Sequence, residues 1–212
     1  MSTILAVDIL LDPDGRMMAQ AENNNDRLRR VYPDGFALDA EHRPHITLLQ
    51  CFVTAEDLDA LCAAVGDVIG KAKLAEMELQ AVRYYYSPGP GFGVAGICAT
   101  PTPEIQTLQA DVITAAAPFM LATATIDAFT SGHDNPAFDA ALIAYVAGFV
   151  GDQAGPNFNP HVSTGVAPID YLDQMIAEPF VEFAFAPAGA AIYQLGPFGT
   201  AARQLKHWDL AK

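Results

Sequence analysis

Two stretches decide how this chain is interpreted: R-P-H-I-T-L-L at 43–49 and N-P-H-V-S-T-G-V at 159–166. Each places histidine, an apolar residue and a hydroxyl residue in a β-like run, directly after proline. Side chains alternate between the two faces of a strand, so the histidine and the hydroxyl residue of each motif are predicted to share one face. A single His-x-Ser/Thr is common in half-buried strands, but its repetition in the same context favours a chemical role.

The paired groups suit in-line phosphoester chemistry. One imidazole takes a proton from the nucleophile, the other gives one to the leaving group, and hydroxyls hold the phosphoryl oxygens. We therefore predict catalytic roles for His45, Thr47, His161 and Ser163. The sequence leaves open which histidine is the acid and which is the base.

The two motifs resemble the signature of the 2H phosphoesterase superfamily, the LigT-like proteins, whose members include bacterial RNA 2′,3′-cyclic phosphodiesterases, also called 2′-5′ RNA ligases. The tail I-Y-Q-L-G-P-F-G-T-A-A-R-Q-L-K-H-W-D-L at 192–210 is similar to the family's last strand pair, and a length of 212 residues suits the family. The resemblance implies an α+β, bilobal LigT-like fold: two pseudo-symmetric lobes of antiparallel sheet, flanked by helices, with each motif facing a central cleft. The separation between the motifs is long, so extra helix is expected near 120–155.

Hydrophobic periodicity and turn residues predict alternating strands and helices. The strands are expected at about 3–11, 45–53, 76–86, 92–99, 161–166, 179–186, 189–196 and 202–210, and residues 119–129 look extended. Helices are expected at 16–31, from a cap at Thr54, from 102 to 117, from 135 to 150 and at 168–176. A similar order of elements follows each motif, which independently favours a two-lobed duplication within one domain, residues 1–212.

Composition limits the setting. The chain is 51% apolar, yet no apolar run reaches the roughly 18–20 residues of a membrane span, and Asp8 interrupts the apolar N-terminal stretch, unlike a signal peptide. Cys51, Cys62 and Cys98 form no C-x-x-C pair, which favours a reducing compartment. We expect a cytoplasmic monomer that makes no membrane contact.

The charge balance argues against a long nucleic-acid partner. Eleven Lys and Arg face 25 Asp and Glu, a formal net charge of −14, whereas proteins that grip long nucleic acid neutralise many phosphates with basic side chains. The expected partner is a small nucleotide or cyclic phosphate, or at most a short RNA end.

Further candidates come from the residues around the motifs. Tyr85 and Phe92 flank a predicted hairpin, and aromatic residues there either stack on a base or are ordinary strand residues. With Arg43 and Tyr193 they complete the predicted substrate-binding set. His42 and His45 lack the acidic or cysteine partners of a metal site, so no metal and no cofactor are expected. His42 is interpreted as a loop residue, with a place in the cleft wall as the alternative.

Together these observations predict a metal-independent phosphodiesterase acting on a 2′,3′-cyclic phosphate. One alternative is a module of the same fold that binds a nucleotide or cyclic phosphate without turnover. Two others keep the chemistry: 2′-5′ RNA ligation, and hydrolysis of a cyclic or ADP-ribose-derived phosphate outside RNA. Screening of substrates would separate them.

Overall fold

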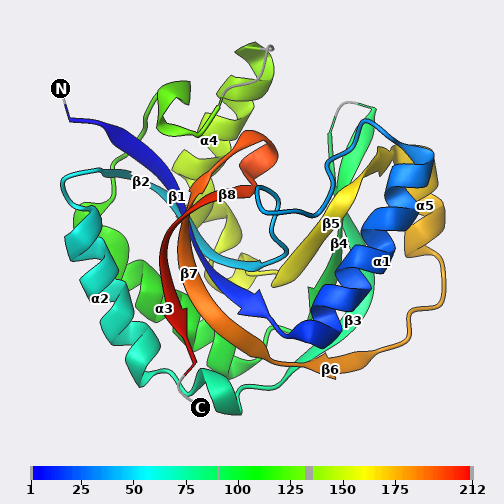
Figure 1. The fold of residues 1–212 in the computed structure, drawn as a ribbon, viewed down its shortest axis with the longest axis horizontal. Helices are drawn as coiled ribbons and strands as arrows, with labels where there is room; N and C mark the ends of the chain where they lie inside the picture. The colour runs from blue at the N-terminus through cyan, green and yellow to red at the C-terminus, as the bar shows by residue number, and fades with distance from the viewer. Residues whose placement is uncertain (1, 90, 132–135, 211–212) are drawn as a thin grey trace.

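The computed structural model describes residues 2–89, 91–131 and 136–210, without the side chains of 136 and 137 (Figure 1). The eight strands are β1 (Ile4–Pro13), β2 (Ile46–Thr54), β3 (Leu79–Pro88), β4 (Phe92–Ala99), β5 (His161–Pro168), β6 (Phe183–Phe185), β7 (Pro187–Leu195) and β8 (Ala201–Asp209). The helices are α1 (Gly15–Val31), α2 (Leu58–Lys71), α3 (Pro103–Ala116), α4 (Pro136–Gln153) and α5 (Ile169–Ile176).

The strands form one sheet with the order β6-β3-β4-β5-β2-β1-β7-β8, and neighbouring strands are antiparallel. The two motif strands, β5 and β2, are neighbours at its centre. They are joined through one residue pair, Ile46 with Val162, whereas the pairs on either side of them are long. The sheet therefore consists of two four-stranded halves that meet at the motifs. This arrangement confirms the predicted α+β class with two halves of antiparallel strands, with the difference that the two halves are parts of one continuous sheet.

The helices cover the two halves separately (Figure 1). Helices α1 and α5 pack over the half that contains β5, where Leu28, Leu172 and Met175 bury themselves against the small side chains of Ala95 and Ala167. Helices α2 and α3 pack against each other beside the other half, and α4 contacts β2. Although α1 directly follows β1, it packs mainly on β5, so the chain crosses between halves.

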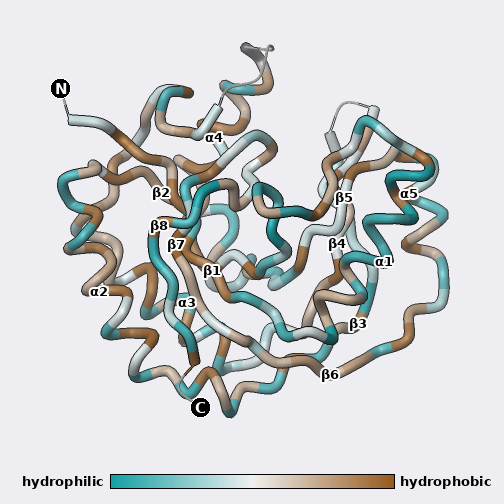
Figure 2. Tube along the Cα trace, viewed as in Figure 1, coloured by the Kyte–Doolittle hydropathy of each residue, from teal (hydrophilic) through white to brown (hydrophobic). Residues whose placement is uncertain are grey.

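The close approach of α1 to β5 depends on a glycine. Gly165 has a φ of 148°, and a Cβ atom there would lie 3.0 Å from both Asn25 Nδ2 and Leu28 Cδ1. Backbone in this region strongly favours glycine. The amide of Asn25 donates to the carbonyl of Thr164 over 2.9 Å, and that of Asn24 to the Thr164 hydroxyl over 2.8 Å. These bonds explain how a helix that is hydrophilic along most of its length (Figure 2) still docks on the sheet.

Local sequence explains several helix starts. Asp14 caps α1 by accepting bonds from the backbone N–H groups of Arg16 and Met17, and Thr102 caps α3, with Pro103 in the first turn, as such residues commonly do. The predicted cap at Thr54 is wrong. Thr54 forms a turn with Asp57, and α2 begins only at Leu58.

Two further predictions need correction. Residues 119–129 do not form an extended run: 3₁₀ turns occupy Ala117–Phe119 and Ile126–Ala128, and a single bridge joins Leu121 to Phe52. The strand predicted at 179–186 shrinks to β6, Phe183–Phe185, because the edge of the sheet offers it a short pairing with β3. Among the described residues, no helix is long and apolar enough to cross a membrane.

Candidate functional site

A cavity of about 510 Å³ lies where the two halves of the sheet meet. Its walls come from the loop before β2, from β2 and β5, from the β3–β4 hairpin, from α4 and from the turn between β7 and β8. The volume falls in the range of about 300–1,000 Å³ that is typical of small-molecule sites. A single cavity thus collects segments from most of the chain around the two motifs.

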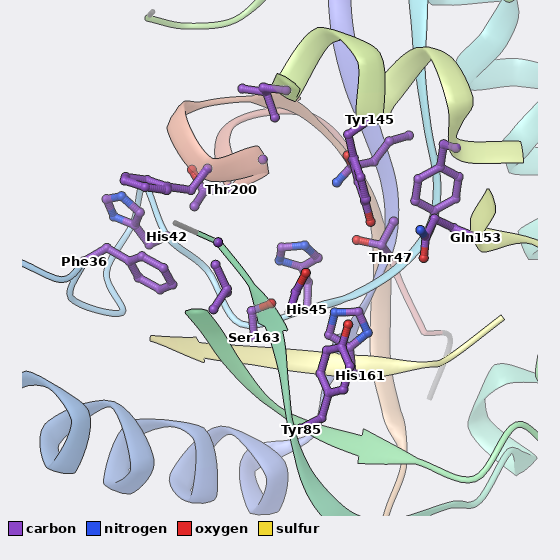
Figure 3. A pocket seen from close by; sticks show the side chains of 18 of the residues that line it. Phe36, His42, His45, Thr47, Tyr85, Tyr145, Gln153, His161, Ser163 and Thr200 are labelled. Atoms are coloured by element: carbon purple, nitrogen blue, oxygen red, sulfur yellow. The ribbon is translucent and has the colours of Figure 1, made fainter. Parts of the chain in front are cut away.

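All four motif side chains line this cavity (Figure 3). In an antiparallel pair, residues directly opposite each other point to the same face. The pairing of Ile46 with Val162 therefore sets His45 beside Ser163 and Thr47 beside His161. Ile46 and Val162 themselves are buried in the main core. The sheet register brings two histidines and two hydroxyls together on one wall.

His45 is held through both ring nitrogens. Nδ1 lies 2.6 Å from the carbonyl oxygen of Arg43, and because a carbonyl can only accept, Nδ1 carries a hydrogen. Nε2 lies 3.3 Å from Oδ2 of Asp8, a fully buried residue of β1. A neutral ring with hydrogen on Nδ1 would turn a lone pair toward this carboxylate, so the protonated ring fits its surroundings better.

The pKa of His45 follows from that arrangement. Burial opposes protonation, but the contact with Asp8, the charge of its carboxylate and the Arg43 carbonyl outweigh burial and raise the pKa. Asp8 also accepts bonds of 2.9 Å from the Thr47 hydroxyl and from the Gln50 side-chain amide. Asp8 therefore links the first histidine to the first hydroxyl.

His161 has the opposite surroundings. Its Nδ1 lies 2.8 Å from the carbonyl oxygen of Asn159, which again places the hydrogen on Nδ1 and leaves the lone pair of the neutral ring on Nε2. Burial, together with the positive charges of His45 and Arg83, lowers the pKa of His161 against the raising effect of the Asn159 carbonyl. The surroundings of the pair thus favour the cation at His45 and the neutral ring at His161.

Three of the four predicted substrate-binding residues, Arg43, Tyr85 and Phe92, line the cavity. The ring centroids of Tyr85 and His161 lie 5.1 Å apart. The guanidinium of Arg43 donates from Nε to the buried Asp12 carboxylate over 3.0 Å.

Tyr193 is not among the residues that line this cavity, and its predicted role in substrate binding stays a prediction. β7 lies two strands away from β2. The Tyr193 ring packs with Leu10, Ala191 and Ala201, and its hydroxyl donates to the Gln204 side chain over 2.9 Å. Tyr193 pairs directly with Asp8, so its side chain lies on the same face of the sheet as that carboxylate, packed toward β8.

The site also depends on residues to which the sequence analysis gave no role. Asp8 is fully buried and is not part of the cavity wall, but its carboxylate contacts His45 and Thr47. Asp8 was visible only as an isolated charge in an apolar strand, which is a signal because a buried carboxylate needs partners. Figure 3 shows Tyr145 reaching from α4 toward Thr47, and α4 lies in the segment where extra helix was expected. His42 lies in a loop, as interpreted, and it also lines the cavity, where its ring stacks on that of Phe36. Nothing in the sequence near these residues marks their position relative to the motifs.

Within the described parts of the chain, no group of three or more His, Cys, Asp or Glu side chains is arranged to hold a metal ion. The arrangement can supply, from protein groups alone, a proton donor, a proton acceptor and hydroxyls around one position.

Comparison with known proteins shows which family the sequence is similar to. The sequence model of the 2′-5′ RNA ligase superfamily matches residues 19–186, which include both motifs. Among curated proteins, none is similar enough to count as a match.

Solved structures resemble the chain over nearly its whole length. The crystal structure of TT0787 of Thermus thermophilus is 16% identical, with 97% of this chain and 98% of that chain covered and a TM-score of 0.55. E. coli LigT complexed with 3′-AMP is 13% identical over 100% of both chains, with a TM-score of 0.47. Kluyveromyces marxianus Usb1 is 11% identical over 97% of this chain and 98% of that chain, with a TM-score of 0.46. At these identities the first structure supports the fold, and the others carry no further argument.

The family match covers well over half of the chain, and it agrees with the 2H resemblance that the two motifs indicated, which is thereby confirmed. On the evidence of that match, this chain belongs to the 2′-5′ RNA ligase superfamily.

Proposed function

We propose that this protein is a phosphoric diester hydrolase that opens a 2′,3′-cyclic phosphate of a nucleotide or of a short RNA end. The observation that carries the proposal is the contrast between two histidines in one cavity. His45 contacts a buried carboxylate, whereas His161, which is partly buried, makes no such contact and receives the unfavourable charge of His45. Acid–base catalysis of a phosphodiester requires this combination of one protonated and one neutral group.

The geometry favours one assignment of roles. Neutral His161 accepts a proton at Nε2 from the water that attacks phosphorus, and a new P–O bond forms. The bond from phosphorus to one ribose oxygen breaks, and protonated His45 gives its Nε2 proton to that oxygen. The product is a phosphomonoester, and proton exchange with solvent returns both histidines to their starting states.

Asp8 supports the acid without sequestering its proton. Charge-assisted N–H···O bonds are usually about 2.7–2.9 Å long, and the 3.3 Å contact between His45 Nε2 and Asp8 is longer. The carboxylate therefore stabilises the cation through its charge while Nε2 stays able to face a leaving group. Because the Thr47 hydroxyl already donates to Asp8, Ser163 is the hydroxyl more readily turned toward a phosphoryl oxygen.

The second candidate is ligation, which the name of the superfamily favours. It uses the same groups, with a 5′-hydroxyl taking the place of water. The third is a binding module that never turns over, and it predicts affinity for a cyclic phosphate without product.

The deciding experiment measures turnover of 2′,3′-cyclic AMP in the presence of EDTA. The wild-type protein should form adenosine monophosphate, and His45→Ala and His161→Ala should lose this activity. His207→Asn removes an imidazole from β8, outside the cavity wall, and serves as the matched control that keeps activity. Binding without product in the wild type would support the non-catalytic module, and activity abolished by EDTA would contradict the metal-independent mechanism.

A further inference from the structure

Four aromatic rings gather at one end of the cavity. Phe36 and His42 stack with ring centroids 5.2 Å apart and planes 6° from parallel. The ring centroid of Phe198 lies 6.5 Å from that of Phe36 and 5.1 Å from that of Phe138. Since all four rings line the cavity, we call them the four-ring cluster. Figure 3 shows Phe36 and His42 on the side of Ser163, so this end lies next to the motifs.

The cluster unites three segments that are far apart in the chain. Phe36 and His42 belong to the loop that leads into β2, Phe138 to the first turn of α4, and Phe198 to the G-P-F-G-T turn at 196–200 between β7 and β8. The chemistry of the histidines leaves this turn without a role.

Phe198 adopts a costly backbone conformation. Its φ and ψ are 61° and 14°, in the left-handed region that a bulky side chain rarely adopts. Among the described residues, Phe198 is the only non-glycine residue with a positive φ. The ring stays 38% exposed, so deep burial does not offset the strain. Strained residues persist mainly where the surrounding structure holds them for a functional purpose.

The charges of the cavity limit what can lie against these rings. Among the described lining residues, Arg43 is the one with a formal charge other than a histidine, and its Nε is already paired with Asp12. The cavity therefore offers no row of cations for a second or third phosphate. A ligand with one phosphoryl group at the motifs would present an uncharged remainder to the four-ring cluster.

We propose that the four-ring cluster binds the nucleobase of a single nucleotide whose phosphate lies at the two motifs, and that the strain at Phe198 holds its ring in that position. This inference rests on the proposed function for the location of the phosphate. Every base has a flat face that stacks on aromatic side chains, and a half-exposed ring at a cavity wall offers such a face. The cluster thus defines the substrate class as a mononucleotide, read mainly through stacking.

The test compares affinities that need no turnover. Calorimetry gives the Kd of the full chain for adenosine 2′- and 3′-monophosphate and for glycerol 2-phosphate, a secondary-alcohol phosphate without a flat group. The better-bound adenosine phosphate should bind more tightly than glycerol 2-phosphate, and Phe198→Gly should reduce this preference by about 5- to 150-fold, the usual worth of one stacked base. Affinity for glycerol 2-phosphate should change less than about 2-fold, because that ligand makes no stacking contact.

Stability separates binding from a structural role. Glycine adopts positive φ freely, so Phe198→Gly removes the ring and the strain together, and its Tm should not fall. Phe36 has no positive φ, so Phe36→Leu removes a ring without releasing backbone strain. This variant should also lower the preference for the adenosine phosphate, whereas Phe198→Tyr should keep it. Tyr145→Leu changes a ring on the other side of the motifs and should leave the preference intact.

Several results would overturn the inference: equal affinity of the wild type for both kinds of phosphate, an unchanged preference in Phe198→Gly, or a preference that disappears in Tyr145→Leu instead. These outcomes are independent of the cyclic phosphodiesterase assay. Hydrolysis of 2′,3′-cyclic AMP without base preference would refute nucleobase binding at the four-ring cluster and leave the proposed function intact. A Phe198-dependent binding preference without hydrolysis would support nucleobase binding and contradict the proposed function.

Discussion

His45 Nε2 lies 3.3 Å from the carboxylate of Asp8, which stands on the neighbouring strand and is fully buried. A buried carboxylate is unfavourable without partners, and this one receives the Thr47 hydroxyl, the Gln50 amide and the His45 ring on a single oxygen, Oδ2. The other oxygen, Oδ1, lacks a hydrogen-bond partner within the described chain. Asp8 is therefore committed to the motif side of the cavity, where its charge sets the protonation of His45.

Asp8→Asn should narrow the pH profile of hydrolysis. The pKa of His45 is raised because the contact with Asp8, the charge of that carboxylate and the Arg43 carbonyl together outweigh burial, so removing the charge of Asp8 should lower it. If His45 is the acid, the alkaline limb of kcat/KM should move to lower pH, while the acid limb set by His161 moves little. Profiles recorded across about pH 5–9, the range in which imidazoles titrate, check this. Asp209→Asn, at a side chain that is 95% exposed, should leave the profile unchanged.

The two histidines should titrate on opposite sides of the ordinary value of 6.5, His45 above and His161 below. The ring proton signals in NMR report each titration directly, and His45→Ala and His161→Ala assign them. In His45→Ala, the pKa of His161 should rise, because the cation that opposes its protonation has gone. Identical titrations for both rings would remove the basis for assigning separate acid and base roles.

Loss of either histidine should cost about 10²–10⁴ in kcat, the usual worth of a general acid or base. Because the two act on one proton-transfer sequence, His45→Ala combined with His161→Ala should lose far less than the product of the two single losses. Steady-state kinetics on 2′,3′-cyclic AMP measure this, with thermal melting to check that each variant is folded. Strictly multiplicative losses would mean that the two histidines act independently.

The two motif hydroxyls should respond differently to removal. Ser163→Ala should weaken ligands that carry phosphate, leave adenosine binding unaffected and change Tm little. Thr47→Val should also destabilise the fold by about 1–3 kcal/mol, because the buried Asp8 carboxylate loses a donor. Calorimetric Kd values and denaturant unfolding distinguish the two effects, and equal stability of both variants would contradict the role given to the Thr47–Asp8 bond.

Parts of this site follow from the sequence because they depend on neighbours along the chain. The period-two alternation of a strand places His45 with Thr47, and Thr102 followed by Pro103 correctly marks the start of α3. The fold was accessible through the two motifs and their resemblance to a family. These features need only local geometry or a recognisable pattern.

The remaining parts depend on the order of strands in the sheet. Asp8 meets His45 because β1 pairs with β2, and Phe198 meets Phe36 because the turn after β7 and the loop before β2 converge on one cavity. Neither result can be deduced from spacing along the chain.

The net charge predicts how length affects the substrate. A protein with a net charge of −14 repels polyanions at long range, and the guanidinium of Arg43 in the cavity is partly neutralised by Asp12. A mononucleotide 2′,3′-cyclic phosphate should therefore be turned over with a kcat/KM equal to or above that of a long RNA ending in the same group. Affinity for the long RNA should also lack the steep salt dependence of proteins that neutralise about six to ten phosphates. Measuring kcat/KM for both substrates at two salt concentrations tests this. A strong preference for long RNA that collapses with added salt would require a basic surface along the cavity and would shift the proposed substrate to polymeric RNA.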